Sequence, residues 1–130
     1  MDRVARLGFI VTILLILTLT VAPVENLRPH AHWSKVTWVP FGDRYLIARD
    51  MIANTLVFVP FGAFGPWRRR RVGARVIMAA GAACLLSTSV ELCQVFSHSR
   101  LPTATDIVTN VAGAMLGALF AATPVDRARA

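Results

Sequence analysis

The hydrophobic positions of the chain fall into four long apolar segments, at residues 7–24, 51–67, 72–96 and 107–122. The first is almost unbroken, and at about 1.5 Å per residue it extends roughly 27 Å, close to the hydrocarbon thickness of a bilayer. Charged residues gather between the segments. The pattern predicts an all-α integral membrane bundle of four transmembrane helices, in a single domain that covers residues 1–130.

Arg3 and Arg6 precede the first apolar segment, an arrangement that cleaved signal peptides share. Pro23 follows directly after the small residue Ala22 and disfavours cleavage there. We therefore expect the segment to be retained as the first helix.

The second and fourth segments contain residues that affect helix packing. Pro60 leaves the carbonyl of Leu56 without its helical partner, and a membrane tolerates such a break only where protein or water satisfies the freed group. Gly113 and Gly117 have the spacing that lets two helix backbones touch. This pair is expected to pack either within the chain or between two copies, as a homo-oligomer.

Three carboxylates lie in or at the edge of the apolar segments, and each is followed by an amide on the same helical face. The pairs are Asp50 with Asn54, Glu91 with Gln94, and Asp106 with Asn110. An ionised group near the centre of a membrane helix costs about 2.5–3.5 kcal/mol, so such groups pair with one another or line a wet cavity. Three such pairs on three helices predict one shared site.

Composition and charge narrow the class of protein. With 55% hydrophobic residues and a mean hydropathy of +0.57, the chain is too apolar for an ordinary soluble domain. The net charge of +7 is typical of nucleic-acid binding, but the arginines flank the apolar segments, so we expect no nucleic-acid partner. Cys84 and Cys93 are too far apart along one helix to form a disulfide, and no His has a ligand spacing from either. The sequence predicts no metal and no cofactor.

The basic residues orient the bundle by the positive-inside rule. They form three groups, before the first helix, between the second and third, and after the fourth: Arg3 and Arg6; Arg68 to Arg71 with Arg75; and Arg127 and Arg129. Both termini are then cytoplasmic, and residues 25–49 and 97–105 lie outside. All three carboxylate–amide pairs fall at the outer end, where Arg100 adds a guanidinium.

A purely structural role remains open for most of these polar residues. Asp50 and Asp106 lie near helix N-termini, where carboxylates cap free N–H groups, and Asn54 and Asn110 can hydrogen-bond between helices. Glu91 lies inside the third helix, at the wrong end for the helix dipole, and this position favours a functional role.

The first outer loop is longer than the others and aromatic. Trp33, Trp38, Phe41 and Tyr45 lie among basic residues, a composition that favours a loop on the membrane surface. The alternative is a lid over the polar cluster that gathers an amphiphilic ligand. His30 and His32 are a weak metal signal.

The polar positions also carry a resemblance to a known family. The matching stretches, over roughly residues 36 to 117, are VPF at 39–41, DMIAN at 50–54, FVPFG at 58–62, ELCQVF at 91–96, Arg100, and DIVTNVAG at 106–113 with Gly117. In these the chain resembles the VanZ-like family of small bacterial membrane proteins, named for a member associated with resistance to the glycopeptide teicoplanin. It departs from the family pattern at Thr37, often Asn, and at Thr103, often Asp. The resemblance implies a multi-pass envelope protein linked to glycopeptide susceptibility.

Three functions remain open. The one we favour is non-enzymatic binding of a lipid-linked anionic headgroup, from a phospholipid or a cell-wall precursor, at the outer end of a protein of the bacterial cytoplasmic membrane. Its ligand-binding candidates are Asp50, Asn54, Glu91, Gln94, Arg100, Asp106 and Asn110. The second is a lipid-directed enzyme with Glu91 as general base and Asp106 or Asp50 as acid, the catalytic candidates. The third is a small proton-coupled exporter, disfavoured because the first helix carries no acid.

Overall fold

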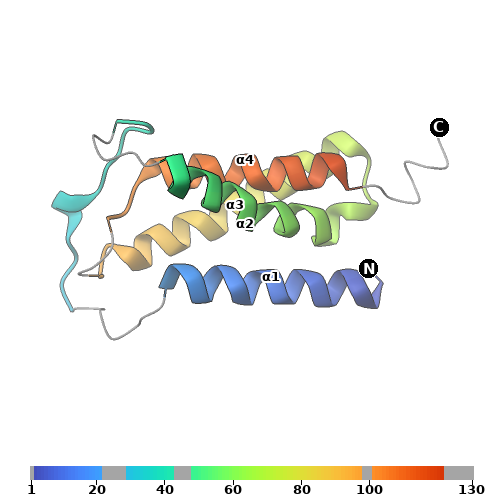
Figure 1. The fold of residues 1–130 in the computed structure, drawn as a ribbon, viewed down its shortest axis with the longest axis horizontal. Helices are drawn as coiled ribbons and strands as arrows, with labels where there is room; N and C mark the ends of the chain where they lie inside the picture. Colours follow the sequence, from blue (N-terminus) through green and yellow to red (C-terminus); the bar gives the residue numbers. More distant parts are fainter. Residues whose placement is uncertain (1, 22–28, 43–47, 98–100, 122–130) are drawn as a thin grey trace.

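The computed structural model describes residues 2–21, 29–42, 48–97 and 101–121. These residues form four α-helices and two short 3₁₀ helices, so the all-α prediction is confirmed. In chain order the elements are α1 (Arg3–Val21), η2 (Trp33–Lys35), α2 (Ala48–Phe64), η3 (Pro66–Arg69), α3 (Val72–Gln94) and α4 (Ala104–Phe120). Successive α-helices run in opposite directions along one long axis (Figure 1).

The helix boundaries differ from the predicted ones by a few residues, for local reasons. The second helix ends at Phe64 and not at residue 67, because Gly65 is extended and Pro66 opens a separate 3₁₀ helix. The fourth begins at Ala104 and not at residue 107, because the Thr103 side chain caps it by accepting a hydrogen bond from the N–H of Thr105, at 3.2 Å.

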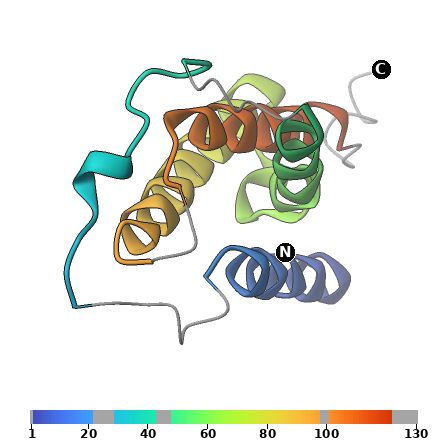
Figure 2. The same ribbon diagram turned by 60° about the vertical axis from the view of Figure 1, so that its left-hand side comes forward.

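Helices α2, α3 and α4 form a compact group, and α1 lies along one side of it (Figures 1 and 2). The core is filled by large side chains from α1, α2 and η3 and by small ones from α3 and α4: Ile16, Phe58, Phe61, Trp67, Ala79, Ala83, Ala114 and Ala118. Small residues on α3 and α4 let these helices approach closely, and the aromatic rings fill the space between α1 and α2.

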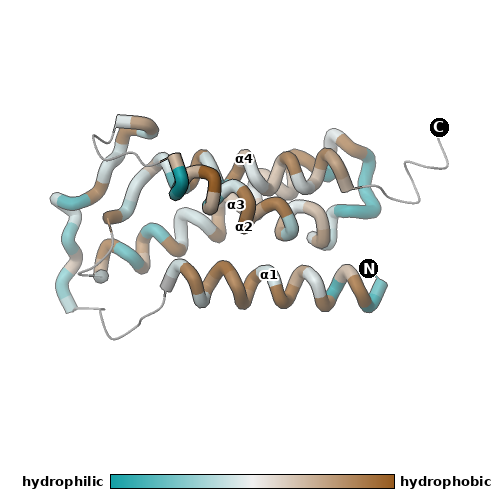
Figure 3. The backbone as a smooth tube through the Cα atoms, viewed as in Figure 1, coloured by the Kyte–Doolittle hydropathy of each residue, from teal (hydrophilic) through white to brown (hydrophobic). Residues whose placement is uncertain are grey.

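Most residues along α1 are apolar, as the brown colour shows in Figure 3. Residues Arg3–Thr20 and Val72–Gln94 are long and apolar enough to cross a membrane, and Ala104–Phe120 is a shorter apolar helix. Large side chains such as Leu7, Leu14 and Leu85 are exposed. Soluble proteins rarely expose so much apolar surface to water, so this surface indicates a membrane protein.

The closest helix contact joins α2 to α4, and three glycines make it. A Cβ atom added at Gly62 would collide with the carbonyl of Ala114, and one added at Gly117 would collide with the carbonyl of Val59. At Gly113 the obstacle is the carbonyl of Thr55. The Gly113 and Gly117 surface therefore packs within the chain against α2, which is one of the two arrangements that the spacing allows.

Pro60 does not end α2, which continues to Phe64. The Nε1–H of Trp67 donates to the carbonyl of Gly62 at 2.8 Å, so the ring from η3 folds back against the helix that it follows. Phe9 of α1 packs edge-on against Trp67, with ring centroids 5.8 Å apart. This aromatic contact joins α1 to the turn between α2 and α3.

One end of the bundle collects the start of α1, η3 and the start of α3, and we call it the basic end after Arg3, Arg6 and Arg68 to Arg71 (Figure 1). There the carboxylate of Asp2 accepts the N–H of Ala5 at 2.7 Å and pairs with Nη1 of Arg68 at 2.9 Å. The hydrogen bond from Ala5, with the charge of Arg68, holds the pKa of Asp2 below its ordinary value. These contacts attach the first turn of α1 to η3.

Arg75 differs from the other basic residues in this region because its side chain is buried, with 1% of the residue exposed. Its Nη2 lies 3.4 Å from the carbonyl of Leu119, in the last turn of α4. A cation there complements the negative end of the helix dipole. Arg75 therefore joins α3 to α4 from inside the bundle.

We predict that Gly117→Ala destabilises the protein by about 1–3 kcal/mol, because the added methyl group must push α2 and α4 apart. Unfolding in a detergent titration, followed by circular dichroism, measures the loss. Gly81→Ala on α3 is the matched control, since no atom lies within 4 Å of the added Cβ. An equal loss in both variants would contradict a role for the close contact.

Candidate functional site

The end opposite the basic end, here called the loop end, is built from residues 29–42, the last turns of α3 and the first turns of α4. Glu91 lies in the last turn of α3 and is 7% exposed. Its Oε2 accepts the N–H of Thr103 at 2.8 Å. The carboxylate of Glu91 therefore fixes the residue that caps α4.

The loop is fastened to the same place by main-chain hydrogen bonds. The N–H of Thr37 donates to the carbonyl of Pro102 at 3.0 Å, and the N–H of Ala104 donates to the carbonyl of Thr37 at 2.9 Å. Thr37 and Thr103 thus form a parallel bridge. Together with the bond to Glu91, the bridge joins α3, α4 and the loop.

A second attachment lies further along the loop. Phe41 has a φ of 60°, a left-handed conformation that costs a non-glycine residue about 1–2 kcal/mol. Its N–H donates to the Thr105 hydroxyl at 2.9 Å. Thr105 is almost completely buried in the first turn of α4. The bond therefore holds the loop at Phe41 against the start of α4.

One helical turn below Glu91, a buried polar pair joins α3 to α4. The Nδ2 of Asn110 donates to the hydroxyl of Ser87 at 2.8 Å. The Oδ1 of Asn110 is buried and has no hydrogen-bond partner among the described residues. Gln94, further up the same face of α3, donates to the carbonyl of Thr20 at 3.0 Å and so holds the end of α1.

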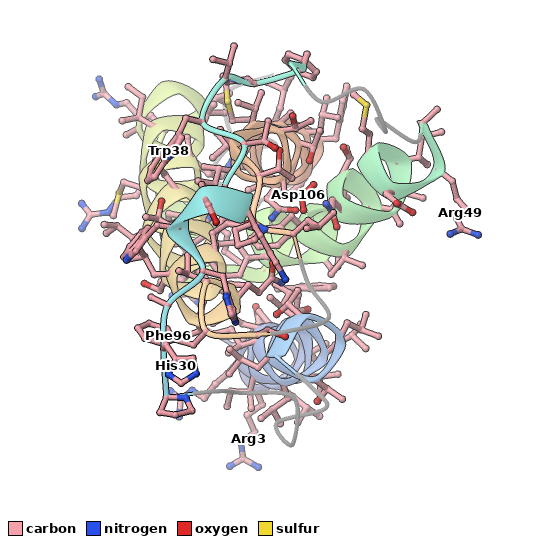
Figure 4. All side chains as sticks on the ribbon, turned by 90° about the vertical axis from the view of Figure 1, so that its left-hand side faces the viewer. Arg3, His30, Trp38, Arg49, Phe96 and Asp106 are labelled. Atoms are coloured by element: carbon pink, nitrogen blue, oxygen red, sulfur yellow. The ribbon has the colours of Figure 1, made fainter. Side chains whose placement is uncertain are left out.

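The remaining predicted site residues are more exposed. Asp106 is half-buried in the first turn of α4, and Figure 4 places it between α4 and α2. Asp50, in the first turn of α2, has a 56% exposed side chain that pairs with Arg49 at 3.4 Å. Asn54 follows one turn later and is half-buried. Asp50 therefore lies at the surface of this end, apart from the buried polar groups.

Arg100, the predicted cation of the site, lies outside the described residues, as does Tyr45. Among the described residues, no three His, Cys, Asp or Glu side chains gather as metal ligands. The rings of His30 and His32 lie 6.4 Å apart. The N–H of His32 donates to the carbonyl of Val95 at 2.8 Å, which places this part of the loop at the end of α3.

A pocket of about 90 Å³ lies between the loop and the facing ends of α3 and α4. The loop contributes Trp33, Val36, Thr37 and Trp38; α3 and the residue after it contribute Thr88, Glu91, Leu92 and Val95; and the start of α4 contributes Pro102, Thr103, Ala104 and Ile107. The two indole rings lie nearly parallel, with centroids 6.2 Å apart. Both are exposed, Trp38 by 68%.

Several residues of this site were given no role from the sequence. Ser87 lies one helical turn before Glu91 on the same face of α3, and that spacing could have identified it. Thr103 and Asp106 have the spacing of a helix-capping motif, which could have identified the start of α4. In contrast, nothing in the sequence indicates that Thr37 pairs with Thr103.

Two helices long and apolar enough to cross a membrane, a shorter apolar helix beside them and polar side chains gathered near one end indicate a helical membrane protein. Over residues 7–124 the chain matches the VanZ/LLP1 family, and it belongs to that family. The family is associated with glycopeptide resistance. Comparison with curated proteins and with solved structures found no significant match.

The two positions at which the chain departs from the family pattern lie side by side. Thr37 and Thr103 form the parallel bridge described above, and both line the pocket. The two departures therefore fall at one place, at the residue whose N–H donates to Glu91.

We predict that Glu91→Ala lowers the free energy of unfolding by about 1–3 kcal/mol, because the part-buried N–H of Thr103 loses its acceptor. Glu91→Gln keeps a side-chain carbonyl and should recover most of the loss. Detergent-induced unfolding measures both. Asp50→Ala is the control, since its exposed ion pair contributes little. Equal stability of Glu91→Ala and the wild type would show that the carboxylate does not hold α4.

Proposed function

We propose that this protein binds a lipid-linked anionic headgroup at the outer face of the bacterial cytoplasmic membrane, and that this binding underlies a role in glycopeptide resistance of the teicoplanin type. The bound headgroup belongs to a phospholipid or to a cell-wall precursor. When occupied, the site hinders a membrane-anchored antibiotic from reaching its target.

The orientation rests on charge. The arginines in the first turns of α1 and between α2 and α3 lie at the basic end, which the positive-inside rule assigns to the cytoplasm. The loop end then faces outward. Its exposed tryptophans, Trp33 and Trp38, suit the depth of the lipid headgroups, where indole rings concentrate in membrane proteins.

The observation that carries the proposal is the meeting of a polar cluster with an apolar pocket at one end of the bundle. Glu91 takes part in both, since its carboxylate bonds to Thr103 and its side chain lines the pocket. An amphiphile presents the same combination, a polar headgroup next to hydrocarbon. Arg100, in the segment between α3 and α4, is the cation that we assign to the phosphate.

The enzyme alternative draws no support from this geometry. A general base needs access to the proton that it removes, whereas Glu91 is buried and accepts a main-chain N–H. Asp50, one of the two candidate acids, lies at the surface with Arg49. Glu91 is better explained as a positioning residue for the loop and α4.

We predict that the purified protein binds phosphatidylglycerol more tightly than phosphatidylcholine, and that Arg100→Ala weakens the binding of phosphatidylglycerol about tenfold, equivalent to about 1.4 kcal/mol. Native mass spectrometry with each lipid gives the ratio. Arg49→Ala is the matched control, because Arg49 lies at the same end, 85% exposed, and pairs with Asp50. Equal binding of the two lipids by the wild type would overturn the proposal for phospholipid headgroups, and a lipid-linked cell-wall precursor would then be the probe.

A second prediction concerns cells. In a deletion strain, the wild-type gene should restore teicoplanin resistance, Arg100→Ala should restore little of it, and Arg49→Ala should restore most, at equal protein levels. Minimal inhibitory concentrations measure the effect. A loss that extends to lipophilic cations would instead favour an exporter.

A further inference from the structure

The pocket at the loop end is small and almost entirely apolar, although six of its lining residues carry polar side-chain groups: Trp33, Thr37, Trp38, Thr88, Glu91 and Thr103. The Oε2 of Glu91 is directed to the N–H of Thr103. The main-chain groups of Thr37 bond to Pro102 and Ala104. The surface left to the pocket therefore consists mainly of methyl, methylene and ring carbons.

An apolar space of this kind does not suit water. A buried water molecule needs two to four polar partners, and almost none face this pocket. A volume of about 90 Å³ has room for only a few carbon-sized groups. The pocket therefore suits a short length of hydrocarbon.

The pocket is also continuous with the apolar exterior of the bundle. Leu92 lines it and is half exposed on α3, and Leu85, two turns earlier on the same face, is 74% exposed. Trp33 and Trp38 form the opposite wall and are exposed as well. In a membrane, the medium that meets this opening is the upper part of the lipid chains.

We infer that the pocket binds the headgroup-proximal carbons of a lipid chain, and that this chain belongs to the lipid whose anionic headgroup the site binds. The inference rests on the proposed function and adds a site for the lipid chain to the proposed site for the headgroup. Lys35 is the last residue of η2 and lies between Trp33 and Trp38 in the sequence. It provides a cation on the same loop for the anionic headgroup.

The test uses the emission of Trp33 and Trp38 in phosphatidylcholine nanodiscs. Phosphatidylglycerol with a doxyl nitroxide on the fifth carbon of one chain is added, and doxyl phosphatidylcholine is compared with it. The chain has three tryptophans, and the third, Trp67, is buried at the basic end. A Trp33→Phe, Trp38→Phe double variant retains only Trp67 and gives the background to subtract.

If the inference is right, quenching by doxyl phosphatidylglycerol saturates at a low mole fraction and is reversed by the unlabelled lipid. Ala104→Leu and Thr88→Leu, which fill the pocket from α4 and α3, should each raise the half-saturating fraction roughly tenfold. Ala112→Leu is the matched control, because Ala112 is exposed on α4 away from the pocket.

Three other results have separate meanings. Quenching that rises linearly with mole fraction, equally in all variants, means contact with bulk lipid only and overturns the inference. The inference is also overturned if the protein prefers phosphatidylglycerol, Arg100→Ala removes this preference and both filling variants leave it intact. The proposed function then stands. Saturable quenching by both lipids alike, removed by the filling variants, supports the chain site and contradicts headgroup selection.

Discussion

A polar group inside a bilayer has to find its hydrogen-bond partner within the protein, because the surrounding hydrocarbon offers none. This constraint accounts for the arrangement of most buried polar side chains described here. Glu91 accepts the N–H of Thr103, Asn110 donates to Ser87, and Trp67 donates to the carbonyl of Gly62. Each bond joins segments that are separate in the sequence or at opposite sides of a turn, so satisfying the polar groups also assembles the bundle.

The close contact of α2 with α4 provides the frame for these bonds. Without a hydrophobic effect between helices in lipid, close packing of small residues is a main source of association. Gly62, Gly113 and Gly117 let the two backbones touch. Helix α3 then lies against α4, where Ser87 can reach Asn110 and Glu91 can reach the residue before α4.

The loop end combines these elements around one pocket. Main-chain bonds at Thr37 hold the loop over the start of α4, and the loop supplies two indole rings to one wall of an apolar pocket. Polar groups border the pocket without facing into it. The proposed ligand, a lipid with an anionic headgroup, has the same order of polar and apolar groups.

The sequence by itself determined the four helices and the membrane class, because apolar segments of this length are governed by local composition and by the thickness of the bilayer. It also identified Glu91, Gln94 and Asn110 as unusual, since polar residues stand out in apolar segments. Only the tertiary structure decided what they contact. Their partners are a main-chain N–H, a main-chain carbonyl and a serine hydroxyl, which have no distinctive sequence pattern. The sequence also left open whether the Gly113 and Gly117 surface packs within the chain or between two chains, because the same spacing suits both. The fold places α2 against this surface.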